Sequence, residues 1–268
     1  MSMLRAGCLA LRAAALPCAL LLAACGTPAP RASDGGTTAA AANMQLGSAY
    51  LQQGNLQVAK DKLERAAAQS PRDPQVRGLL AILYSRMGQD DRAEESFRDA
   101  LKFAPADPDL LNNYAVFLCS HGRADEGVKR FEQAAANPLY RTPWAAYANA
   151  GVCLRGVNRT AEAAARFERA LQARPDYAEA LVQLADLDMA EGRAPRALAR
   201  VQAFLGRNPA SPDVLLAGWR AASAQQDKIA TVQFAWRLHT EFGDSEQAKS
   251  LAGGGAPGPP PGQPPSQP

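Results

Sequence analysis

One pattern recurs along this chain at a nearly constant interval, and it restricts the fold more than any other feature. A large apolar residue marks each unit, at Leu63, Phe97, Phe131, Phe167, Val201 and Phe234, and the steps between them are 34, 34, 36, 34 and 33. Repeats with periods of roughly 20–50 residues are typical of solenoids, in which each unit packs only against its neighbours. We therefore expect an elongated repeat domain.

Each unit also carries fixed residues for a turn and for close helix packing. Residues that tolerate a left-handed backbone at a helix end lie nine positions before the apolar residue, at Gly54, Gly88, Gly122, Asn158 and Gly192. Prolines that end the second helix lie eight positions after it, at Pro71, Pro105, Pro175 and Pro209. Small residues that admit the second helix lie midway along each first helix, at Gly47, Ala81, Ala115, Gly151, Ala185 and Gly218.

These marks are the tetratricopeptide repeat (TPR) pattern. The pattern predicts an all-α fold, a TPR solenoid built as a right-handed superhelix of about six helix-turn-helix repeats over residues 43–252. The first helix of each repeat should line the inner face. The sixth unit has Gln225 at the turn position and lacks the closing proline, so we expect a capping helix to cover its apolar residues.

Residues 1–24 are typical of a lipoprotein signal peptide. Arg5 and Arg12 supply positive charge, and residues 13–22 form an apolar stretch too short to span a bilayer. The stretch runs into Leu-Ala-Ala-Cys-Gly, the lipobox pattern in which Cys25 receives the lipid anchor. An ordinary secretory signal with a chance cysteine is the alternative. Gly26, rather than an aspartate, favours the outer membrane, so we expect a lipid-anchored protein on its periplasmic face.

Two segments flank the repeats without an apolar period of their own. Residues 25–42 are rich in Pro, Gly, Ser, Thr and Ala, which predicts a flexible tether after the lipidated cysteine. Residues 253–268 are rich in Gly and Pro and offer no apolar face, which predicts a disordered tail. A Pro-rich ligand for another domain is the alternative for this tail.

Two cysteines remain in the mature chain besides the lipidated one. Cys119 and Cys153 are separated by one repeat step, so they should lie at nearly the same height on neighbouring first helices. An oxidising periplasm favours a disulfide between them. Two small buried residues with free thiols are the alternative.

Residue patterns for catalysis or metal binding are missing from the sequence. Neither His121 nor His239 has ligands at metal-binding spacing, and no phosphate-binding loop or activated nucleophile is present. Carboxylate pairs such as Glu94–Glu95 fit a solvated helix face. The net charge of +3 is too small to indicate nucleic acid. We therefore expect no enzyme, no cofactor or metal, and no nucleic-acid or small-molecule ligand.

Partner binding is then the expected activity, on the inner face of the solenoid. The repeat positions that should face this groove hold Ile82, Ser85, Asn112, Val116, Cys119, Ala145, Ala148, Val152 and Arg155. This lining is mostly apolar and lacks the basic cluster that clamps a C-terminal carboxylate. It favours an extended or helical protein segment with apolar anchors. The amide of Asn112 can bond that segment's backbone, unless it only caps or solvates its helix.

Three stretches are more particular than a generic TPR. They are LGSAYLQQGNLQVAKDKLERA (46–66), LNNYAVFLCSHGR (111–123) and NPLYRTPWAAYANAGVCLR (137–155), and the NPLYRTP insertion accounts for the step of 36. Together with the lipobox, they resemble the type IV pilus biogenesis and stability lipoprotein family, known as PilF or PilW. Asn158 at a turn and the Pro-rich tail depart from that family.

The resemblance implies an outer-membrane pilotin, a lipoprotein that binds the pilus secretin and promotes its localisation and multimerisation. Another periplasmic TPR adaptor, for example in outer-membrane protein assembly, is the alternative. A cell-wall scaffold would require peptidoglycan-binding features, which the sequence lacks.

Overall fold

The computed structural model describes residues 34–251, and every regular element in that range is an α-helix. This confirms the predicted all-α class. The helices are α1 (Asp34–Gln52), α2 (Leu56–Gln69), α3 (Pro74–Arg86), α4 (Asp90–Phe103), α5 (Pro108–Ser120), α6 (Ala124–Ala135), α7 (Pro143–Gly156), α8 (Thr160–Ala173), α9 (Ala178–Ala190), α10 (Ala194–Leu205), α11 (Pro212–Ala224), α12 (Lys228–Phe242) and α13 (Glu246–Leu251).

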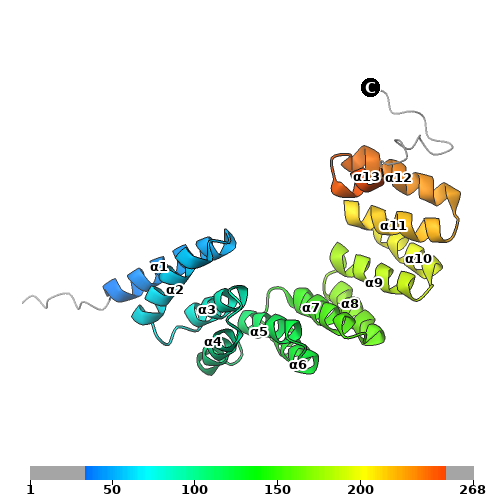
Figure 1. Ribbon diagram of the computed structural model, residues 1–268. Coiled ribbons are helices and arrows are strands. Elements are labelled where there is room, and N and C mark those ends of the chain that lie inside the picture. Colours follow the sequence, from blue (N-terminus) through cyan, green and yellow to red (C-terminus); the bar gives the residue numbers. More distant parts are fainter. Residues whose placement is uncertain (1–33, 252–268) are drawn as a thin grey trace, which may run out of the picture.

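Consecutive helices pack in pairs, and the pairs follow one another along an arc (Figure 1). The first helices from α1 to α9 line the inner side of this arc, their second helices lie on its outer side, and α12 and α13 lie beyond α11 at its C-terminal end (Figure 1). Each pair touches mainly the next pair along the chain. This is the expected solenoid of six units, and it leaves a concave face built from first helices alone.

The turn residues inside each pair take the backbone conformation that the repeat pattern predicts. Gly54, Gly88, Gly122 and Gly192 have φ between 69° and 76°, and Asn158 has φ 60°. The sixth unit differs, because Gln226 rather than the predicted Gln225 takes the left-handed conformation, with φ 59°. The shorter step before Phe234 accounts for the difference, since it places the apolar residue one position closer to its turn.

Large side chains of the second helices press directly on small residues of the first helices. A β-carbon added at Gly151 would lie 2.6 Å from the ring of Phe167, and one added at Gly47 would lie 2.6 Å from Leu63. Phe234 is seated on Gly218 in the same way. Such separations are far below van der Waals contact, so glycine is what allows these pairs to close.

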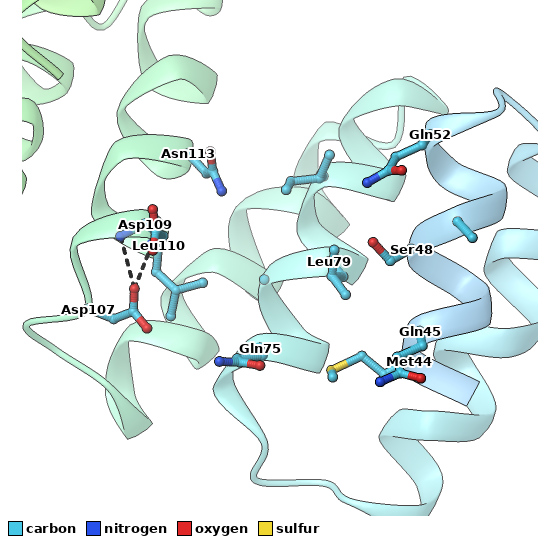
Figure 2. Close-up of a pocket in the computed structure, with 13 residues that line it drawn as sticks. Met44, Gln45, Ser48, Gln52, Gln75, Leu79, Asp107, Asp109, Leu110 and Asn113 are labelled. Carbon is cyan, nitrogen blue, oxygen red and sulfur yellow. Dashed lines mark hydrogen bonds between the residues drawn. The ribbon is translucent and has the colours of Figure 1, made fainter. Parts of the chain in front are cut away.

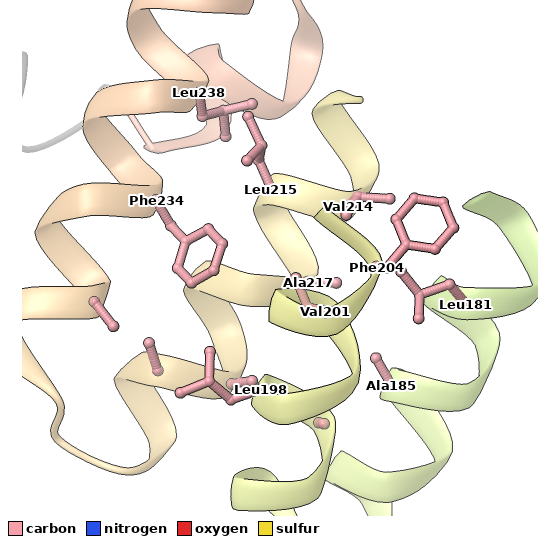
Figure 3. Close-up of a cluster of buried hydrophobic side chains, with 14 of the residues drawn as sticks. Leu181, Ala185, Leu198, Val201, Phe204, Val214, Leu215, Ala217, Phe234 and Leu238 are labelled. Carbon is pink, nitrogen blue, oxygen red and sulfur yellow. The ribbon is translucent and has the colours of Figure 1, made fainter. Parts of the chain in front are cut away.

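The C-terminal units share one apolar core. Leu181, Val201, Phe204, Leu215 and Phe234 are among its buried side chains, contributed by α9 to α12 (Figure 3). The short helix α13 packs on α11 and α12 and buries Ala248. It occupies the place where a seventh unit would stack, as expected for a capping helix.

The first helix begins earlier than the predicted boundary at residue 43. Helix α1 starts at Asp34 and buries Ala40, so residues 34–42, assigned to the tether, belong to the first repeat in the structure. The four consecutive alanines at 39–42 explain this, because alanine has the highest helix propensity. The signal peptide, Cys25, the start of the tether and the tail lie outside the described residues.

No helix within 34–251 is both long and apolar enough to cross a membrane.

Candidate partner-binding groove

The concave face contains a groove of about 490 Å³ at its N-terminal end, between α1, α3 and α5 (Figure 2). We call it the N-terminal groove. Its lining comprises Met44, Gln45, Ser48, Ala49 and Gln52 from α1, Gln75, Gly78, Leu79 and Ile82 from α3, and Asp107, Asp109, Leu110 and Asn113 at the start of α5. Ile82, which the repeat pattern assigned to the groove, therefore lines it.

The apolar floor of this groove depends on one missing side chain. Leu110 is buried, and its side chain occupies the space where a β-carbon at Gly78 would stand. Leu79 and Ile82 are half-buried on α3. Met44 on α1 lies across the groove from Leu79 (Figure 2). The floor thus offers apolar surface to a ligand, while the amides of the surrounding side chains can bond a peptide backbone.

The α5 side of the N-terminal groove is acidic. Asp107 Oδ1 accepts hydrogen bonds from the backbone N–H groups of Asp109, at 3.0 Å, and Leu110, at 3.1 Å, which caps α5 (Figure 2). Burial, followed by the charge of Asp107, raises the pKa of Asp109 above its usual value. Among the residues that the structure describes, no lysine, arginine or histidine lines the groove.

Two exposed valines mark the middle of the concave face. Val116 on α5 is 47% exposed and Val152 on α7 is 41% exposed, which is unusual for residues of this size in otherwise buried helices. Asn112 and Asn149 flank them, and the amide of Asn149 donates to that of Asn112 at 3.1 Å. We call Val116, Val152 and these two amides the central patch. It offers apolar anchors next to polar groups that are already partnered.

Charged groups follow the central patch toward the C-terminus. Arg155 on α7 donates a hydrogen bond to Gln183 on α9. Burial raises the pKa of Asp186, while the charges of Arg220 and Arg155 oppose that rise. Arg155 is thus already engaged with neighbouring repeats, and a partner reaching it would compete with those contacts.

The remaining predicted groove residues do not all reach the concave surface. Ala148 is only 3% exposed and packs in the core shared by α7, α8 and α9, so its assignment to the groove is wrong. Its position on α7 faces the neighbouring helices rather than the open side. Ala145 and Ser85 are half-buried on their helices, and neither lines the N-terminal groove.

Cys119 and Cys153 form a disulfide that links α5 to α7, with their α-carbons 5.6 Å apart. Cys119 therefore points away from the groove, toward its bonded partner. Its sulfur occupies the space where a β-carbon at Gly127 on α6 would stand. The second helices of the other repeats carry alanine at this position. Glycine at 127 therefore makes room for the sulfur of Cys119.

The repeat pattern did not single out most of the N-terminal groove. Its α1 residues belong to the first unit, from which no groove position had been assigned. Asp107 and Asp109 belong to the turn and the first turn of α5, which fixed repeat positions do not cover. The spacing of Met44, Ser48 and Gln52 by four residues was the available signal, because such residues share one helix face.

The described part of the chain contains no group of three or more His, Cys, Asp or Glu residues placed to hold a metal ion. What the arrangement offers is a concave surface with an apolar floor, backbone-bonding amides and one acidic side. Concave faces of this kind are the surfaces with which repeat solenoids bind other proteins.

Comparisons with known proteins agree with this geometry. A family model for the tetratricopeptide repeat matches residues 50–97 and 154–217. The type IV pilus assembly protein PilF of Pseudomonas aeruginosa is 27% identical over 197 residues, which cover 74% of this chain and 78% of that protein.

Two solved structures share both the fold and part of the sequence. PilW, described as a widely conserved type IV pilus biogenesis factor, superimposes with a TM-score of 0.62 at 29% identity, over 79% of this chain and 97% of PilW. A structure of Pseudomonas aeruginosa PilF superimposes with a TM-score of 0.63 at 26% identity, over 81% of this chain and 97% of that one.

The paired helices, the left-handed turns and the concave face define a TPR solenoid, a class of scaffold that binds other proteins and is typically non-enzymatic. Within that class, the similarity to PilF and PilW supports a type IV pilus biogenesis TPR protein.

Proposed function

We propose that this protein is an outer-membrane lipoprotein of the pilotin type, which binds the pilus secretin through its concave face and promotes the secretin's localisation and multimerisation. The observation that carries the proposal is the apolar concave face of a solenoid homologous to PilF and PilW. A pilus biogenesis protein with a binding face needs a protein ligand, and the secretin is the pilus component that must assemble in the outer membrane.

Lipid anchor and concave face have separate roles in this proposal. The lipid on Cys25 holds the protein at the membrane, and the central patch and the N-terminal groove hold the secretin segment there. Both must work together, because either alone would leave the secretin away from its site of assembly.

A first test concerns the concave face. The double variant Val116→Glu with Val152→Glu places two charges on the central patch without disturbing the core, since both side chains are already exposed. We expect it to remain folded and membrane-bound, yet to leave the secretin monomeric and the cells without pili. Secretin multimers are measured by gel electrophoresis without full denaturation, and pili by electron microscopy.

The matched control for this variant is Val157→Glu, at another valine that is 41% exposed but lies in the turn after α7. It should leave the multimers and the pili intact. Normal multimers in the double variant would remove the central patch from the mechanism. Normal multimers in a strain lacking the whole protein would remove the pilotin function itself.

A second test concerns the anchor. Three acyl chains, at roughly 0.8 kcal/mol for each buried CH₂, hold a lipoprotein stably in a bilayer. The variant Cys25→Ser should therefore move the protein from the outer-membrane fraction to the soluble periplasm. The readout is its position in a density gradient. A serine variant that still floats with outer membranes would show that Cys25 carries no anchor.

Affinity purification of the lipidated protein separates this proposal from the adaptor alternative. Mass spectrometry of the captured proteins should find the secretin enriched. Components of the outer-membrane protein assembly machinery in its place would favour the adaptor.

A further inference from the structure

We propose that the N-terminal groove selects a partner segment that carries a basic side chain next to an apolar one, with the basic group placed against Asp107 and Asp109. The inference rests on the proposed function for the class of partner, which is a protein segment, and adds the chemistry by which that segment is recognised.

The apolar half of the recognition comes from the floor of the groove. Leu79, Ile82 and Leu110 form a continuous apolar surface that the missing side chain of Gly78 allows. One apolar side chain of a ligand can bury itself there, and burial of apolar area is the main favourable term in such binding.

The preference for a basic group in the ligand comes from two carboxylates of the groove that lack a counter-ion. Neither Asp107 nor Asp109 forms a salt bridge with any described residue, whereas Glu94 on the neighbouring α4 pairs with Arg123 at 2.7 Å. Asp107 uses Oδ1 to cap α5, and no donor among the described residues contacts its Oδ2.

Asp109 is exposed to solvent, so a ligand cation can reach it. Partial burial and the charge of Asp107 raise its pKa, so both carboxylates gain from a nearby cation. The rest of the lining consists of apolar side chains, amides and one hydroxyl, which supply no positive charge. A ligand ammonium or guanidinium group provides it, whereas an acidic ligand group would be repelled.

The test uses a display library of random 12-residue peptides, selected on the full-length protein solubilised in detergent and immobilised. Peptides recovered on the wild-type protein should combine apolar residues with Lys or Arg. Selection on the double variant Asp107→Asn with Asp109→Asn should keep the apolar residues and lose the basic ones. Asparagine at position 107 still caps the helix, so the variant remains folded.

The control variant, Asp91→Asn with Glu95→Gln, removes two negative charges from α4, whose side chains line no part of this groove. It should recover the same basic peptides as the wild type. For one selected peptide, replacing its Lys by norleucine should weaken binding to the wild type by about 2–5-fold and leave binding to the groove variant unchanged.

Peptides without basic enrichment on the wild-type protein, or identical peptides from wild type and groove variant, would overturn the inference. Because the library contains no secretin, this outcome is independent of the proposed function. If overlapping secretin peptides bind the groove without a basic residue, the inference fails while the pilotin function stands. If the secretin is not a partner but basic peptides are still selected, only the pilotin function fails.

Discussion

Replacing Phe167 by alanine is expected to lower the free energy of unfolding by about 3–5 kcal/mol. The ring of Phe167 is 0% exposed and lies on Gly151, so its loss leaves a cavity between α7 and α8 in the centre of the solenoid. Glycine at 151 offers no side chain to fill that cavity. The measurement is urea denaturation followed by circular dichroism.

The matched control is Phe103→Ala, the same chemical change at a phenylalanine that is 46% exposed at the end of α4. It should change stability by less than about 1 kcal/mol. Equal losses in the two variants would mean that packing of the aromatic ring on Gly151 does not hold these repeats together.

Removing the disulfide, by Cys119→Ala with Cys153→Ala, is expected to cost about 3–4 kcal/mol of stability. In the chain-entropy account, the bond restricts the unfolded chain by closing a loop across its 34-residue separation. The expected decrease appears as a lower urea midpoint for the double variant under oxidising conditions.

Reducing agent supplies the control for this prediction. It should lower the midpoint of the wild-type protein to about that of the double variant, and it should leave the double variant unchanged. A wild-type midpoint that does not respond to the reductant, with complete reduction verified by thiol labelling, would contradict a stabilising bond between the two repeats.

The helix pairs were predictable from the sequence because their signals are local. A left-handed turn residue such as Gly88, a large apolar residue such as Phe97 and a small residue such as Ala81 each act within one repeat or between neighbours. The last unit shows the limit of these signals. The left-handed position keeps its step of 34 from Gly192 to Gln226, whereas Phe234 lies one residue closer to its turn, so counting back from Phe234 pointed to the wrong residue.

The groove was harder to predict, because exposure depends on how neighbouring repeats rotate against one another. Val116 and Val152 are exposed as their spacing indicated, yet Ala148 on the same helix as Val152 is buried by the following units. The acidic side arises where the turn before α5 meets α3. The repeat pattern describes positions along single helices, so it could not predict which residues come together between this turn and α3.

The disulfide also sets how this solenoid responds to mechanical force. In the proposed function, the protein is held by lipid at one end and bound to an assembly, so it would be pulled along its length. Repeats that touch only their neighbours would then yield one after another. The bond between Cys119 and Cys153 removes a 34-residue segment from that extension. At about 3.3–3.6 Å per residue, the reduced protein would lengthen by roughly 11–12 nm more than the oxidised one. Under such a load the bond would keep Val116 and Val152 close together, because each lies within three residues of a bonded cysteine.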